Sequence, residues 1–148
     1  MRVTGIDTLS RNLSQIAKNL TNIEPLTHDI SEILYSETIE SFSRESSPFG
    51  EAWKKSQRVL KHGGRTLYDD HTANNKRRHP THLQDSIYTK SDRNSAKVGT
   101  NREYGKFHQL GTSKMVAREF LPIRDGKIPR ELSAEIMSVA REYILSVE

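Results

Sequence analysis

The first part of the chain contains six apolar residues whose spacing places them on one face only if the segment is a helix. They form an apolar stripe and are spaced by three and four residues: Ile6, Leu9, Leu13, Ile16, Leu20 and Ile23. This spacing matches the 3.6-residue helical period, so it predicts an amphipathic helix that ends at Pro25. Thr27 is predicted to cap a second helix, which runs to about Arg44 before the Ser46-Ser47-Pro48 sequence stops it.

The rest of the chain has turn residues between short apolar runs. Residues 54–60 favour a short, weak helix. Residues 86–90 and 96–99 flank an Asp-Arg-Asn-Ser turn, which predicts a β-hairpin. One or two helical turns are expected before Gly111, an extended segment over 118–123, and a helix that starts near Pro129. That last helix carries an apolar face made of Leu132, Ile136, Val139, Ala140, Tyr143 and Val147.

The order of these elements predicts the fold class. Helices, then strands, then a helix indicate α+β rather than an alternating βαβ chain. The prediction is N-terminal helices, a small antiparallel sheet with a hairpin, and a C-terminal helix packed on that sheet. A length of 148 residues fits a single domain over 1–148, with residues 69–81 as an exposed inserted loop.

Composition excludes several classes of protein. The chain has no cysteine, so it has neither a disulfide framework nor thiolate chemistry. No apolar run approaches the about 18 residues of a membrane span, and the first residues lack the apolar core of a signal peptide. We therefore expect a protein that stays in the cytoplasm and has no membrane partner.

The positive charge is concentrated in the middle of the chain. The net charge is +4, and residues 41–100 hold twelve basic and six acidic side chains. Lys76, Arg77 and Arg78 form its densest cluster, which permits contact with nucleic acid or an acidic protein surface. A nucleic-acid-binding module that uses the basic 54–78 region is thus an alternative function.

Catalytic signatures are missing from the sequence. Asp69, His71, His79 and His82 supply metal-ligand types, but their spacing matches no known zinc motif, so a metal-dependent enzyme is the weakest alternative. His108 has no nucleophile or acid placed beside it by a known motif. We expect its ring to bond to backbone in the turn before Gly111. The sequence predicts no catalytic residue, no metal and no cofactor.

One ordered set of motifs points to a family. Ser-Ser-Pro-Phe-Gly-Glu-Ala-Trp (46–53) is followed by Leu-x-x-Ser-Ile (83–87), Val-Gly (98–99), Tyr-x-x-x-His-Gln-x-Gly (104–111) and Arg-x-Phe-Leu (118–121). This order resembles the phage virion morphogenesis family, the tail-completion proteins typified by the G protein of phage Mu. The matching positions are Pro48, Gly50, Trp53, Leu83, Ser86, Ile87, Val98, Gly99, Tyr104, His108, Gln109, Gly111, Arg118, Phe120 and Leu121.

The resemblance implies a function that nothing else in the chain suggests. It implies a non-enzymatic structural protein that acts in tail completion or head–tail joining, binds other tail or neck proteins, and forms a homo-oligomer such as a ring. Such a protein would work in the host bacterial cytoplasm during assembly and could stay in the virion tail or neck. The sequence departs from the family pattern at Leu67 and Asp69, where the following glycine is replaced by the inserted stretch from Asp70 to Thr81.

Overall fold

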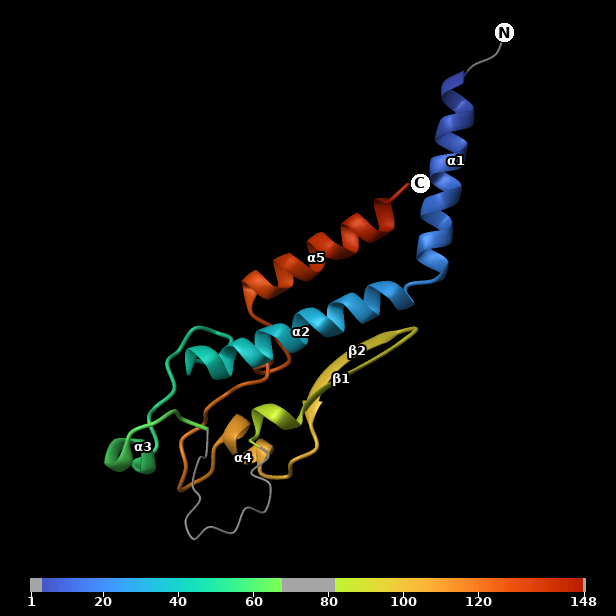
Figure 1. Ribbon diagram of the computed structural model, residues 1–148. Coiled ribbons are helices and arrows are strands. Elements are labelled where there is room, and N and C mark those ends of the chain that lie inside the picture. The colour runs from blue at the N-terminus through green and yellow to red at the C-terminus, as the bar shows by residue number, and fades with distance from the viewer. Residues whose placement is uncertain (1–3, 68–81, 148) are drawn as a thin grey trace.

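The computed structural model describes residues 4–67 and 82–147. A long central helix, α2 (Glu24–Arg44), has the hairpin on one side and the C-terminal helix α5 (Arg130–Leu145) on the other (Figure 1). The N-terminal helix α1 (Thr4–Thr21) leaves the start of α2 and extends beyond the end of α5. The α+β class is confirmed, but α5 packs on α2 rather than on the sheet.

The predicted hairpin is confirmed. Strands β1 (Ile87–Asp92) and β2 (Ser95–Thr100) pair antiparallel, with Ile87 opposite Thr100 and Asp92 opposite Ser95. Asp92 stabilises the turn, because its carboxylate accepts the Asn94 backbone N–H at 2.9 Å and the Ser95 hydroxyl at 2.6 Å. These bonds lower the pKa of Asp92, the Ser95 hydroxyl contributing most.

Short helical segments lie around the lower part of the molecule in Figure 1. They are α3 (Gln57–His62), the 3₁₀ turn η1 (Gln84–Ser86) and α4 (Gly105–Leu110). Both α-helical segments match the expected positions within a few residues. The 118–123 segment, which the sequence predicts to be extended, belongs to no regular strand.

The start of α2 differs from the prediction. Pro25 lies in its first turn, where the missing backbone N–H costs nothing, and Ile23 occupies the N-cap position. Thr27 is not a cap. It is buried within the helix, and its hydroxyl donates to Asp92 O of the hairpin at 2.6 Å and lies 2.9 Å from Glu24 O.

Several buried positions of α2 carry hydroxyl groups. Ser31, Thr38 and Ser41 are almost fully buried. Each hydroxyl donates to a carbonyl three or four residues earlier, as Thr38 does to Leu34 O at 2.8 Å. The polar atoms are therefore satisfied inside the helix.

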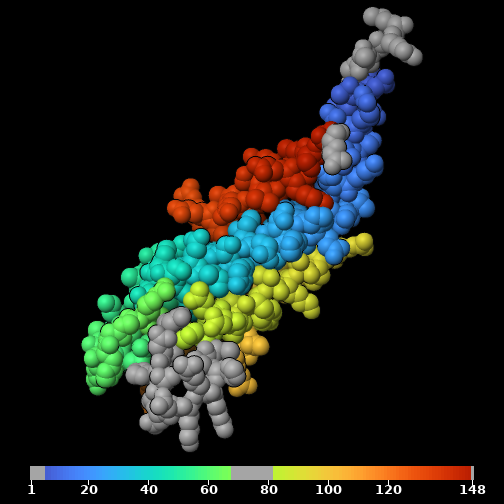
Figure 2. Space-filling view, in the orientation of Figure 1, coloured from blue at the N-terminus to red at the C-terminus, as the bar shows by residue number. Residues whose placement is uncertain are grey.

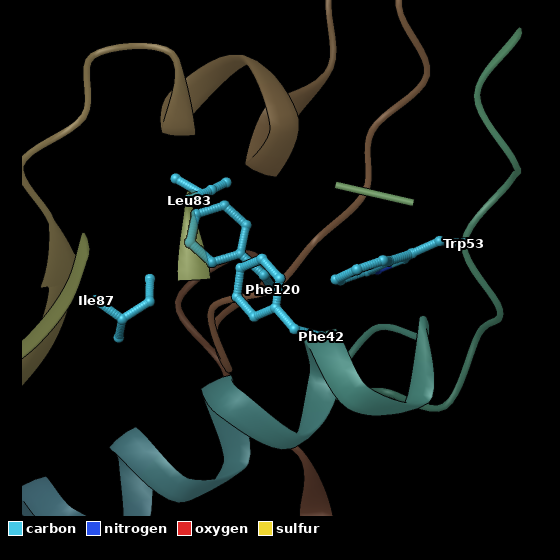
Figure 3. Packing of buried hydrophobic residues seen from close by; sticks show 5 residues of the cluster. All are labelled: Phe42, Trp53, Leu83, Ile87 and Phe120. Atoms are coloured by element: carbon cyan, nitrogen blue, oxygen red, sulfur yellow. The ribbon is translucent and has the colours of Figure 1, made fainter. Parts of the chain in front are cut away.

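The apolar core lies near the C-terminal end of α2. It consists of Phe42, Trp53, Leu83, Ile87 and Phe120 (Figure 3). The Phe42 ring meets the Trp53 ring edge-on at 5.5 Å and the Phe120 ring at 5.4 Å. Four separate segments supply these five residues, so the core joins parts of the chain that are far apart in sequence.

Candidate functional site

The Pro-x-Gly-x-x-Trp motif forms a turn that anchors Trp53 in the core. Gly50 adopts a φ of +95°, and its N–H donates to Ser47 O at 2.9 Å. The indole Nε1 of Trp53 donates to Glu119 O at 2.8 Å, so its polar N–H is satisfied within the buried cluster. The first motif is thereby tied directly to the Arg-x-Phe-Leu motif.

An ion cluster that the sequence did not predict reinforces the same junction. Arg124 pairs with Glu51 and Glu119, each at 2.6 Å, and its guanidinium lies 4.3 Å from the centre of the Phe49 ring. The bonds from Arg124 and Ser47 lower the pKa of Glu51 to about 2, and those from Glu51 and Glu119 raise the pKa of Arg124. Glu51 and Arg124 are 73 positions apart, so no spacing rule could pair them.

The Leu-x-x-Ser-Ile and Val-Gly motifs join the hairpin to the core. Leu83 and Ile87 are core members, and Val98 packs against the core from β2. The Ser86 hydroxyl donates to Leu83 O at 2.6 Å and lies 2.6 Å from the Thr100 hydroxyl. Gly99 lies against the Tyr88 ring, where an added Cβ would be 3.6 Å from the Tyr88 hydroxyl oxygen.

Gln109 holds the 120–123 segment with its side-chain amide. Its Oε1 accepts the backbone N–H groups of Phe120 at 3.0 Å and Leu121 at 2.9 Å. Its Nε2 lies 3.3 Å from Leu121 O and 3.3 Å from Ile123 O. The amide thus presents a donor and an acceptor as the edge of a neighbouring strand would.

Arg118 joins its segment to α4 through His108 and to the chain that follows Trp53 through Lys54. The Arg118 N–H donates to His108 O at 2.6 Å, and the Arg118 Nε donates to Lys54 O at 2.7 Å. The His108 ring is half-buried and meets the Tyr104 ring edge-on at 6.1 Å. Burial lowers the pKa of His108, and the Arg118 charge lowers it further.

The prediction that the His108 ring bonds to backbone is wrong for one of its two nitrogens. Its Nδ1 is buried with no hydrogen-bond partner within the described part of the chain. The turn before Gly111 is instead stabilised by backbone, since the Gly111 N–H donates to Phe107 O at 2.9 Å. Gly111 has a φ of +72°, which suits glycine.

Several predicted residues do not enter this arrangement. Pro48 is only partly buried and lines a surface groove with Phe49 and Pro129. Lys76, Arg77 and Arg78, and the candidate metal ligands Asp69, His71 and His79, lie outside the described residues, as does the 69–81 loop. Within 4–67 and 82–147, no group of three or more potential metal ligands is found.

Part of the basic 54–78 region has structural contacts. Arg65 donates to Phe42 O at 2.9 Å and to Ser43 O at 3.1 Å, at the end of α2. Arg58 donates to Arg65 O at 2.9 Å. These two guanidinium groups therefore stabilise the turn after α3 in addition to contributing positive charge.

The motifs therefore build a single framework, the motif junction, from residues 46–54, 83–87, 98–111 and 118–124. In this junction the carboxylates of Glu51 and Glu119 are both paired with Arg124, and His108 faces an aromatic ring and a cation. This chemistry fixes backbone segments against one another. It does not resemble a nucleophile with its base.

Residues of the junction line a surface groove of about 550 Å³. Its lining comes from the end of β2, α4 and the held segment: Gly99, Thr100, Asn101, Arg102, Glu103, Gly105, Lys106, Gln109, Leu110, Phe120 and Leu121. Large apolar side chains stay exposed on and near α4, with Leu110 79% and Phe107 45% exposed. Exposed apolar side chains around a groove are typical of a protein-binding surface.

The profile of the phage virion morphogenesis family matches residues 5–144, nearly the whole chain. The chain belongs to this family. It is also similar to the Mu-like prophage FluMu G protein 1 of Haemophilus influenzae, strain ATCC 51907 / DSM 11121 / KW20 / Rd. The two are 32% identical over 127 residues, which cover 79% of this chain and 82% of the relative. No solved structure matches the chain.

Because the chain belongs to this family, the motif junction is part of a phage morphogenesis protein. The resemblance drawn from the motifs is confirmed, and every motif position that the sequence singled out lies in described structure. Among the described helices, none is both long and apolar enough to cross a membrane.

Proposed function

We propose that this phage morphogenesis protein is a non-enzymatic structural factor that acts in tail completion or head–tail joining. The observation that supports the proposal best is the motif junction. Its polar side chains hold backbone, and it leaves an apolar groove and the exposed face of α4 beside it. A rigid framework with an open apolar surface suits an assembly contact.

The partners in this proposal are other tail or neck proteins and further copies of the chain. Copies joined head to tail through a heterologous interface would close into a ring if the rotation between them allows it. Assembly would take place in the host bacterial cytoplasm, and the protein could remain in the virion tail or neck. The proposal needs no cofactor.

Electron microscopy of lysates tests the proposed stage. With the gene removed from the parent phage, we expect DNA-filled heads to accumulate beside separate or over-long tails. Normal infectious particles would contradict the proposal, and the nucleic-acid alternative would then be tested by the salt dependence of DNA binding.

Complementation of the same deletion tests the groove as the contact surface. Leu110→Glu places a charge on the most exposed apolar residue of the groove, so we expect it to fail to restore joined particles. Leu60→Glu is the matched control, because Leu60 is 63% exposed on α3, away from the groove. Equal restoration by both variants would remove the groove from the proposal.

A further inference from the structure

The apolar stripe of α1 stays largely uncovered in the folded chain. Ile6, Leu9, Leu13 and Leu20 are between 56% and 62% exposed. The helix extends from the rest of the molecule, and its N-terminal half reaches beyond α5 (Figure 2). A row of four large apolar side chains on one helix face is more than the scattered exposure of an ordinary surface.

The contact of α1 with its own chain uses a neighbouring face, which shares Ile16 with the stripe. Asn19 donates from Nδ2 to the carbonyls of Tyr143 at 3.0 Å and Ser146 at 2.9 Å, at the end of α5. Asn12, Gln15 and Ile16 are partly buried along the same side. The contact with α5 therefore fixes the direction in which α1 presents its exposed stripe.

The spacing of the stripe has the regularity of a coiled-coil seam. Steps of three and four alternate without interruption through positions 6, 9, 13, 16, 20 and 23, which places Ile6, Leu13 and Leu20 at heptad position a and Leu9, Ile16 and Ile23 at d. Five of these six residues lie within α1. The helix is about 27 Å long, enough for two and a half heptads.

The flanks of the seam carry no charge. Positions e and g are Ser10, Asn12, Ala17 and Asn19, whereas Asp7, Arg11 and Lys18 lie at b and f, away from it. Charges at e and g set the choice and orientation of the partner helix, and like charges placed opposite each other repel, so an uncharged flank opposes no like charges when the second helix is identical. The small side chains of Ser10, Ser14 and Ala17 line a surface groove beside Leu9 and Leu13, into which facing side chains can insert.

We propose that α1 packs along its exposed stripe against α1 of a second copy of this chain. The inference rests on the proposed function for its premise that the protein self-associates, and it names a contact between two copies that is distinct from the head-to-tail contact of a ring. The interface is isologous: the same stripe supplies both sides, with no like charges opposed across it.

Sedimentation of the full chain over a broad concentration range tests the pairing. We expect the natural chain to associate, and Leu9→Glu combined with Leu13→Glu to raise its dissociation constant at least about tenfold. Arg11→Glu is the matched control. It changes the net charge by the same amount on the same helix but faces away from the seam, so it should associate as the natural chain does. Circular dichroism checks that each variant is folded.

A cysteine crosslink gives a second readout. The natural chain has no cysteine, so a single Leu13→Cys reports on position 13 alone. We expect oxidation to crosslink Leu13→Cys efficiently and Arg11→Cys poorly. Equal crosslinking of the two would overturn the pairing.

A natural chain that stays monomeric at every concentration would also overturn it. If the Leu9 and Leu13 variants then lost binding to a tail component, the stripe would belong to a different partner. Neither result would alter the particles seen when the gene is deleted, so the two proposals fail separately.

Discussion

The amide of Gln109 supplies the hydrogen bonds that residues 120–123 would otherwise need from a neighbouring strand. It accepts two backbone N–H groups and lies within donor range of two carbonyls. Phe120, held in this way, is fully buried in the core. One side chain therefore couples the order of a loop to the packing of the aromatic cluster.

Replacing Gln109 should destabilise the fold measurably. In Gln109→Ala the N–H groups of Phe120 and Leu121 lose their acceptor, which costs about 1–3 kcal/mol for each buried group left unsatisfied. Gln109→Glu keeps an acceptor but cannot donate to the carbonyls, so it should also destabilise. Urea unfolding followed by the fluorescence of Trp53, the single tryptophan, measures the change. Urea midpoints equal to that of the natural chain would show that the Gln109 amide contributes nothing to stability.

The half-buried His108 predicts a pH dependence of stability. Its folded pKa lies below the ordinary value of 6.5, because burial and Arg118 disfavour the imidazolium. Below pH 6.5 the unfolded chain therefore binds this proton more readily than the folded one, and stability falls as the pH falls. A series of unfolding curves from neutral to mildly acidic pH should show a smaller fall for His108→Gln. His28→Gln, at an exposed position on α2, controls for the loss of a histidine as such.

At the scale of elements, the ends of the short segments depend on glycine. Gly111 terminates α4 with a φ of +72° and a ψ of 177°, a conformation that is nearly restricted to glycine. A Cβ there would lie 2.9 Å from Ala117 N and 3.0 Å from Met115 O. Gly50 also has a positive φ, but a Cβ there would meet nothing within 4 Å.

Alanine substitutions at these two glycines should therefore differ. Gly50→Ala should cost only the backbone strain, about 1–3 kcal/mol. Gly111→Ala adds a backbone clash to similar strain, so its melting temperature should fall further. Thermal unfolding of both variants makes the comparison. Equal losses would mean that the segment around Ala117 moves aside freely.

Elements whose signals are local could be predicted from the sequence. The α1 stripe, the hairpin turn and the glycine that ends α4 each depend on residues within one segment. The start of α2 could not be predicted in this way. Thr27 has the chemistry of a cap, but it lies inside the helix, where its hydroxyl bonds to the backbone of the distant Asp92. The sequence motifs contain residues that the structure brings together in the junction. They gave no sign of the Glu51–Arg124 pairing, which forms only after folding.

At the scale of the whole molecule, the two ends of α2 carry different parts of the structure. The core and motif junction lie toward its C-terminal end, and α1 projects from its N-terminal end (Figure 1). Between these ends, α2 contacts both strands of the hairpin and α5. The apolar core thus lies away from the helix that we assign to self-association.

This division predicts the result of deleting residues 1–22. None of the five core residues lies in α1, whose main contacts are with α5. The shortened chain should still unfold cooperatively, with a melting temperature close to that of the full chain. It loses the bonds from Asn19, and that from the Tyr143 hydroxyl to Asn22 O, so amide hydrogen exchange should increase at the end of α5.

The same deletion should abolish the pairing of copies through α1 and so weaken concentration-dependent association, because it removes the exposed stripe. A chain shortened in this way that remains folded but monomeric would place self-association in α1 and stability in the rest of the molecule. Loss of cooperative unfolding would instead mean that the contact between α1 and α5 is required for the core. The Leu9 and Leu13 variants, which leave the Asn19 bonds intact, would then be needed to separate association from folding.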